Sequence, residues 1–183
     1  SVVLDGSVAA VVAGGAIPKS EMQGLKDMGL LTHNNFSGEP FPEYALGMSQ
    51  NEIKSQPCWG CPIGCAYQIK ILQGPEKGAV AYPCGGAENL EGVGSNLGIA
   101  DPGSNYFLLD LCDRYGLESS HVGCAIGVAI EAFQKGILKE KDTDGLVLEF
   151  GNAETMKKLI KKIAYREGIG ELLGKGSKTV AEI

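Results

Sequence analysis

The sequence predicts a mainly α-helical protein, a multi-helical domain with a small β hairpin after a cysteine-rich loop. Two patterns predict this fold class: helix-type spacing of apolar residues from residue 104 onward, and two short β-prone runs around a turn-rich segment, 73–78. With 183 residues, of which 44% are hydrophobic, the chain is long enough to bury one core. We therefore expect residues 1–183 to form a single domain.

Helical pieces are expected first at residues 8–12 and 20–30, with Ser20 as the N-cap of the second piece. Residues 33–50 contain several Asn, Gly and Pro residues and are expected to form a loop or an extended arm. The cysteine-rich loop follows this arm.

The predicted strands of the hairpin are residues 67–72 and 79–82, which segment 73–78 connects. Segment 83–102 is dense in glycine and is expected to be irregular. Serine or asparagine N-caps and glycine stops then delimit the remaining helices. In order, these helices run from Ser104 to Gly116, from Ser119 or Ser120 through Phe133 with Gly136 as the stop, from Asn152 to Gly168, and onward from near Gly170.

The net charge of −6 argues against a nucleic-acid partner, because proteins that bind phosphate backbones carry clustered Lys and Arg. Four lysines do cluster, but on a helical pattern that is typical of a solvated helix face; they are Lys157, Lys158, Lys161 and Lys162. No apolar run approaches the length of a membrane span. We expect a cytoplasmic protein whose cysteines are metal ligands and buried thiols rather than disulfides.

Three cysteines, Cys58, Cys61 and Cys65, form a C-x2-C-x3-C run. Gly60 and Gly64 permit the tight curvature that wraps a chain around one metal centre. Converging thiolates suit an iron–sulfur cluster or zinc, and both usually take four ligands, so one ligand must come from elsewhere. Zinc sites favour two separated C-x2-C pairs, and this chain has one pair. The pattern favours a [4Fe–4S] cluster, with zinc as the alternative.

Two further groups of residues carry possible chemistry. Gly116 ends a predicted helix and places Asp113 and Glu118 near that end. Glu88 lies in the glycine-rich segment, where glycines permit close backbone contact with a ligand and a carboxylate can act as acid or base. Taken singly, the first group is also compatible with a solvent-facing helix end, and the second with an ordinary glycine-rich loop.

Taken together and in order, these groups make the chain resemble the tungsten-dependent aldehyde ferredoxin oxidoreductase family. The likeness rests on the cysteine run, on Glu88 ahead of Gly94-Ser95-Asn96, on the 111–117 stretch Leu-Cys-Asp-Arg-Tyr-Gly-Leu, and on the 163–170 stretch Ile-Ala-Tyr-Arg-Glu-Gly-Ile-Gly. It covers nearly the whole chain and looks like the central helical domain of that larger enzyme.

The resemblance implies a tungsten or molybdenum bis-pterin beside a [4Fe–4S] cluster. Cys58, Cys61 and Cys65 would be cluster ligands. Asp113, with Gly116 and Leu117 in a D-x-x-G-L motif, would contact the pterin. Glu88 would be the catalytic residue near the metal. The implied reaction oxidises an aldehyde, or a related carbonyl substrate, to a carboxylic acid and passes electrons to ferredoxin, in a protein whose full length forms a homodimer.

The chain departs from the family pattern in two ways that bear on this interpretation. Glu118 stands where the motif usually ends in Asp, and the fourth cluster cysteine is expected beyond Ile183. We therefore expect a fragment that lacks the N-terminal pterin-binding β domain and the C-terminal helical domain, and that is inactive alone. The competing hypothesis is a non-catalytic zinc or iron–sulfur module with a structural or electron-transfer role.

Overall fold

The hairpin predicted after the cysteine loop is present and belongs to a three-stranded antiparallel sheet. The computed structural model describes residues 51–62, 66–83 and 87–182, so the segments predicted at 8–12, 20–30 and 33–50 lie outside the described residues. The strands, in the order β1-β2-β3, are β1 Glu52–Ser55, β2 Tyr67–Lys70 and β3 Val80–Ala81. Strand β1 was not predicted, because only Ile53 among its residues turns toward the core and the period-2 pattern is too short to detect.

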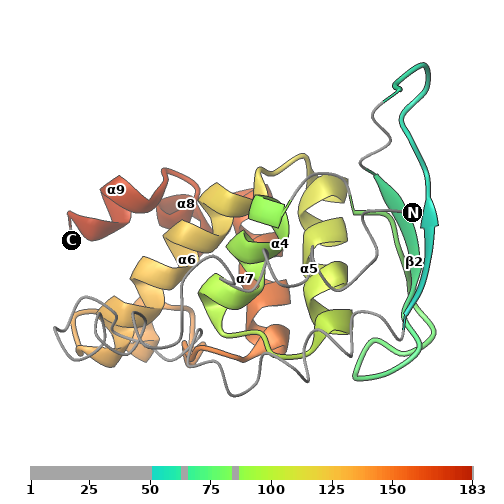
Figure 1. Cartoon of the computed structure of the whole chain (residues 1–183). Coiled ribbons are helices and arrows are strands. Elements are labelled where there is room, and N and C mark those ends of the chain that lie inside the picture. The colour runs from blue at the N-terminus through green and yellow to red at the C-terminus, as the bar shows by residue number, and fades with distance from the viewer. Residues whose placement is uncertain (1–50, 63–65, 84–86, 183) are drawn as a thin grey trace, which may run out of the picture.

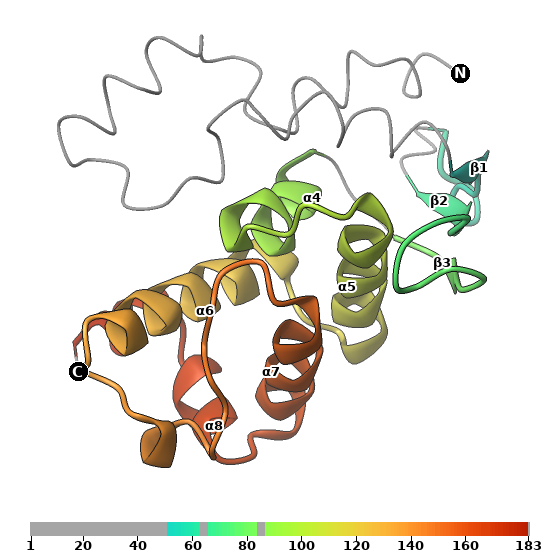
Figure 2. The same ribbon diagram turned by 90° about the horizontal axis from the view of Figure 1, so that it is seen from below.

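The sheet packs one face against the helices. In its register Ile53 pairs with Ile69, and Ile69 pairs with Ala81. These three side chains point to one face, where they contact a small core that includes Tyr106. The views in Figures 1 and 2 place the sheet at one side of the helical body, next to helix α5.

The described helical segments are mostly where the sequence predicts them. They are α4 Ala87–Val93, η2 Ser95–Leu97, α5 Pro102–Tyr115, α6 Ser119–Gln134, η3 Glu140–Asp142, α7 Ala153–Tyr165, α8 Ile169–Leu173 and α9 Ser177–Ala181. Helix α4 and the 3-10 turn η2 overturn the expectation that segment 83–102 is irregular. Gly92 in this segment allows close helix packing, because a Cβ at Gly92 would lie 2.6 Å from the Cα atom of Ser120 in α6.

Several helix ends differ from prediction by a few residues. Asp101, not Ser104, caps α5, because its carboxylate accepts a hydrogen bond from the Ser104 backbone N–H at 2.6 Å. Asn152 caps α7 as predicted, through the Thr155 N–H. The same helix ends at Tyr165 rather than Gly168, since Arg166 adopts the left-handed conformation that usually selects glycine.

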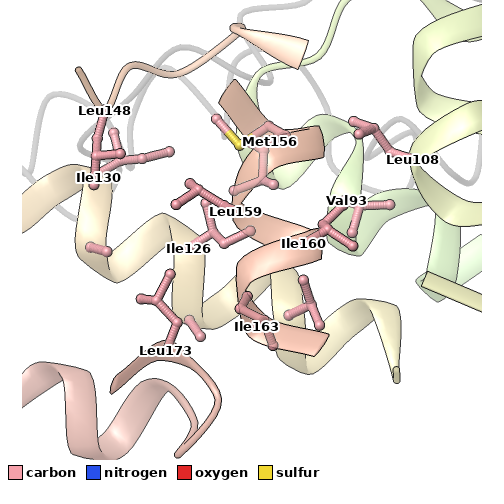
Figure 3. Close-up of a cluster of buried hydrophobic side chains, with 14 of the residues drawn as sticks. Val93, Leu108, Ile126, Ile130, Leu148, Met156, Leu159, Ile160, Ile163 and Leu173 are labelled. Atoms are coloured by element: carbon pink, nitrogen blue, oxygen red, sulfur yellow. The ribbon is translucent and has the colours of Figure 1, made fainter. Parts of the chain in front are cut away.

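The main core lies between helices α4 to α9. Helix α7 contributes the apolar face that its sequence predicts, namely Met156, Leu159, Ile160 and Ile163, all at most 5% exposed. Figure 3 shows these side chains meeting Ile126 and Ile130 of α6, with Val93, Leu108, Leu148 and Leu173 around them. Burying branched aliphatic side chains of this kind contributes about 1.5–3 kcal/mol each.

A salt-bridge cluster joins the hairpin turn to helix α7. Lys157 pairs with Glu76 of the turn and, at 2.6 Å, with Glu154 of its own helix. Its ammonium also lies 5.1 Å from the ring centroid of Phe107. The side chain of Lys157 is 19% exposed, so the prediction that it lies on a solvated helix face is wrong. Among the described residues, no helix is both long and apolar enough to cross a membrane.

Candidate functional site

The cysteine loop leaves one end of the sheet. The Gln56 N–H donates to the Ala66 carbonyl at 2.9 Å, which extends the β1–β2 pairing and closes the base of the loop. Within it, the Cys61 N–H donates to the Cys58 carbonyl at 3.0 Å, so these two cysteines form the ends of one tight turn. Gly60 has φ +73° there, a conformation that glycine adopts without the strain of a Cβ.

The donor chemistry of this turn fits a thiolate-bound metal centre. Cys58 is exposed, Cys61 is partly buried, and both are present as thiols. Cys65, the third predicted ligand, lies outside the described residues, as does Cys84. Within the described ranges no three His, Cys, Asp or Glu side chains gather as a metal site. The three-cysteine cluster site therefore stays a prediction. The two soft donors on one turn, Cys58 and Cys61, are compatible with it.

The remaining described cysteines do not resemble ligands. Burial, together with the negative charges of Asp113 and Glu118, raises the pKa of Cys112 to about 12. Cys112 is therefore a neutral thiol in the core, as predicted. Cys124, in contrast, is exposed on α6, so the expectation of a buried thiol is wrong for this cysteine. The buried residues at this point of α6 are its neighbours Gly123 and Ala125.

Glu88 lies in the first turn of α4, a helix that was expected to be loop; its side chain is outside what the structure describes. Two contacts fix this helix. Gly92 packs against α6, where a Cβ on Gly123 would lie 1.8 Å from the Gly92 carbonyl oxygen. On the other side, the buried Asn105 of α5 donates from Nδ2 to the Leu90 carbonyl at 3.1 Å. The position of the α4 backbone is thus set by both neighbouring helices.

The D-x-x-G-L motif forms the end of α5. Gly116 is left-handed, with φ 67° and ψ 32°. Its N–H donates to the Asp113 carbonyl at 3.1 Å, and the Leu117 N–H donates to the Cys112 carbonyl at 2.9 Å. This is the Schellman arrangement, in which glycine and a following apolar residue end a helix. Gly116 and Leu117 therefore have a role in the fold itself, while Asp113 is exposed at the same helix end.

Glu118, next along the chain, caps helix α6. Its carboxylate accepts the His121 N–H at 2.6 Å and the Ser120 N–H at 3.1 Å, so Glu118 rather than Ser119 or Ser120 is the N-cap. Partial burial acts to raise the pKa of Glu118, but these two N–H bonds hold it below its ordinary value. The acidic residue that ends the motif thus has a structural reason to be acidic.

We expect the replacement of Glu118 by alanine to destabilise the protein by about 1 kcal/mol at neutral pH, the usual magnitude for a lost N-cap. Because folding lowers the pKa of Glu118, its stabilisation is present above the unfolded-state pKa of about 4.3 and is lost as the pH falls through the folded-state pKa. Urea unfolding of both proteins between pH 7 and pH 3 measures this. A difference that does not shrink below pH 4 would contradict the assignment.

The structure brings two of the predicted site segments to one end of the sheet. Since β2 and β3 are antiparallel, the start of β2 lies beside the end of β3, where the Tyr67 N–H donates to the Pro83 carbonyl at 3.1 Å. The cysteine loop enters at Tyr67, and the segment toward Glu88 leaves at Pro83. The third segment, with Asp113, is on α5, which contacts both β3 and α4. Sequence reasoning missed the polar residues Asn105 and Asp110, which make these connections.

Comparison with known proteins gives one consistent family. A family model described as "Aldehyde ferredoxin oxidoreductase, domains 2 & 3" matches residues 16–183. The chain is 34% identical over 188 residues to the tungsten-containing aldehyde ferredoxin oxidoreductase of Thermococcus kodakarensis, an alignment that covers 94% of this chain and 29% of that protein. It is 33% identical over 182 residues to the enzyme of the same name from Pyrococcus furiosus, which covers 93% and 29%.

A second type of relative has a different name. The chain is 34% identical over 123 residues to the "Aliphatic sulfonate oxidoreductase, WOR-like subunit" of Pyrococcus furiosus, covering 67% of this chain and 19% of that protein. The chain thus spans less than a third of the length of these curated relatives, with 29% as the largest of the three shares.

Proposed function

The chain belongs to the aldehyde ferredoxin oxidoreductase family, and from this membership we propose that it is a segment of a tungsten- or molybdenum-pterin oxidoreductase. The whole protein would oxidise an aldehyde to a carboxylic acid and pass the electrons through a [4Fe–4S] cluster to ferredoxin. The relatives named for tungsten and aldehyde support this reaction, whereas the relative named for sulfonate leaves related substrates open.

One observation carries the proposal: the cysteine loop and the Glu88 segment are connected to the sheet at the same end. A thiolate-bound cluster exchanges electrons with a nearby centre, so a catalytic carboxylate and the cluster ligands are expected close together. The hydrogen bond between Tyr67 and Pro83 supports that arrangement, because it joins the two segments directly.

We assign the following roles within this proposal. Cys58, Cys61 and Cys65 bind the iron–sulfur cluster, and the exposed Asp113 hydrogen-bonds the pterin at the end of α5. The metal–pterin group, when bound, supplies the two-electron oxidation of the aldehyde. Glu88 orients the water that adds to the substrate and accepts a proton from it. Overall, aldehyde and water give a carboxylate, two electrons and three protons.

The proposal extends to the setting of the protein. Residues 1–183 act as one domain of the larger enzyme and are inactive alone, as the 29% coverage of the relatives supports. The full-length protein would be a cytoplasmic homodimer with ferredoxin as its partner and with neither nucleic acid nor membrane as a partner. Oxidation of a simple aldehyde by residues 1–183 alone would contradict this part of the proposal.

Replacing Glu88 by glutamine in the full-length protein tests the catalytic assignment. Since general acid–base catalysis contributes about 10²- to 10⁴-fold, we expect kcat to fall by about 100-fold or more while the iron and tungsten contents stay unchanged. A viologen-dye assay with an aldehyde, run under anaerobic conditions, measures this. The matched control is Glu131→Gln on the partly exposed side of α6; equal activity of the two variants would contradict the role of Glu88.

A further inference from the structure

Asp110 is a buried carboxylate that none of the roles above uses. It lies in the middle of α5, is 3% exposed, and ties together two different parts of the chain. One oxygen, Oδ1, accepts the backbone N–H of Tyr82 at 2.7 Å. The other, Oδ2, accepts Nε of Arg114 at 2.6 Å. A carboxylate is costly to bury, so the use of both its oxygens by these two donors indicates a specific role.

The Tyr82 N–H lies between the end of β3 and the start of the Glu88 segment. Tyr82 directly follows β3, and its hydroxyl accepts a hydrogen bond from Gln68 Nε2 at 3.0 Å. The next residue, Pro83, has no N–H of its own and accepts the Tyr67 N–H through its carbonyl. Asp110 therefore anchors the point at which the cysteine loop enters the sheet and the Glu88 segment leaves it.

The second donor, Arg114, belongs to the D-x-x-G-L motif. Arg114 directly follows Asp113, and its guanidinium contacts Asp110, one helical turn earlier in α5. The Asp110 carboxylate thus connects the motif at the end of α5 with the end of β3, next to which the cysteine loop and the Glu88 segment begin.

We propose that Asp110 is a positioning residue that holds the cysteine loop, the Glu88 segment and the Asp113 motif in fixed relative positions. This inference rests on the proposed function for the roles of the three segments, but the anchoring itself is a property of the fold. Asp110 acts through Tyr82 and Arg114 and needs no contact with substrate or cofactor. An asparagine at this position keeps an acceptor for the Tyr82 N–H, whereas an alanine keeps none.

The first test measures amide hydrogen exchange by mass spectrometry in the full-length protein, with fragmentation that resolves Tyr67 and Tyr82. Because Asp110 provides a charged acceptor for the Tyr82 N–H, we expect Asp110→Ala to speed exchange at Tyr82 by about ten-fold or more. The same variant should speed exchange at Tyr67, and Asp110→Asn should restore most of the protection at both amides. Unchanged exchange at Tyr67 in Asp110→Ala would overturn the proposal.

The matched control is Asp144→Ala. Asp144 also accepts a hydrogen bond from one backbone N–H, that of Ile169 at 3.0 Å, and one from a charged side chain, Lys162 Nζ at 2.9 Å. These contacts, however, are at the corner between α7 and α8. Its loss is expected to lower stability without selective exchange at Tyr67 and Tyr82. Equal acceleration of these two amides in both variants would show a general loss of stability and overturn the positioning role.

The second test uses the electron paramagnetic resonance spectrum of the reduced cluster in the full-length protein. We expect Asp110→Ala to shift or broaden the signal, and Asp110→Asn and Asp144→Ala to keep the wild-type spectrum. An unaltered spectrum in Asp110→Ala would overturn the proposal. If the wild-type protein contained no iron, the proposed function would fail, and the exchange at Tyr67 and Tyr82 would by itself confirm or overturn the anchoring by Asp110.

Discussion

Replacing Gly123 by alanine is expected to destabilise the protein by about 3 kcal/mol, the upper part of the range for overpacked cores. The added Cβ would lie 1.8 Å from the Gly92 carbonyl oxygen and 2.4 Å from its carbonyl carbon. Both are backbone atoms, so no rotamer change relieves the overlap and helices α4 and α6 must separate. Because α4 carries Glu88, we also expect the full-length variant to lose activity.

Helix propensity predicts the opposite sign, since alanine is favoured over glycine by about 0.8–1.0 kcal/mol in a helix interior. Gly127, four residues further along α6, is the matched control. The nearest atoms to a Cβ at Gly127 are Asn96 Nδ2 at 3.6 Å and Leu97 Cδ2 at 3.8 Å, which is ordinary contact. Urea unfolding should show Gly127→Ala as neutral or stabilising. A Gly123→Ala protein as stable as the wild type would contradict the described α4–α6 packing.

Replacing Cys61 by serine is expected to remove the iron from the full-length protein. A serine hydroxyl is a poor substitute for a soft thiolate ligand, and the tight turn leaves Cys58 without its neighbouring donor. We expect a loss of most of the iron, of the cluster absorbance and of ferredoxin reduction, which iron analysis and visible spectra measure. The control is Cys124→Ser, which replaces an exposed cysteine on α6. If both variants keep the same iron, the assignment of the cysteine loop is wrong.

Local signals in the sequence predicted much of the fold. Gly116 and Asn152 mark helix ends because glycine and asparagine satisfy terminal backbone groups through local contacts alone. The hairpin was predictable because its turn is dense in Gly and Pro. The sequence also predicted the apolar face of α7 by its helical period.

The missed elements depend on contacts between distant segments. Gly92 and Gly94 look like loop residues, yet they lie in or beside α4, where their missing side chains admit α6 and Asn105. The cap at Asp101 overrode Ser104 because Pro102 starts the helix earlier than the serine suggests. No local pattern signals the packing of these glycines, whereas Asp101 followed by Pro102 is a local start signal that the expectation of Ser104 as the cap passed over.

For the candidate site, the sequence predicted the residues but not their arrangement in space. The residue types and order of Cys58, Glu88 and Asp113 indicate a family, but they do not say how the segments meet. Asp110 and Asn105 look like ordinary polar residues of a helix in the sequence, and both are buried at 3% exposure or less in the fold. Their partners, Tyr82 and Leu90, are far along the chain, so only the tertiary structure identifies them.

Metal analysis of the full-length protein, purified without oxygen, is the most direct test of the proposed oxidoreductase function. Tungsten, molybdenum, iron and zinc should be measured together per chain. We expect about one tungsten or molybdenum and about four iron atoms per chain, the content of one metal–pterin site and one [4Fe–4S] cluster. About one zinc per chain, with neither iron nor tungsten nor molybdenum, would contradict it and indicate a structural zinc module instead.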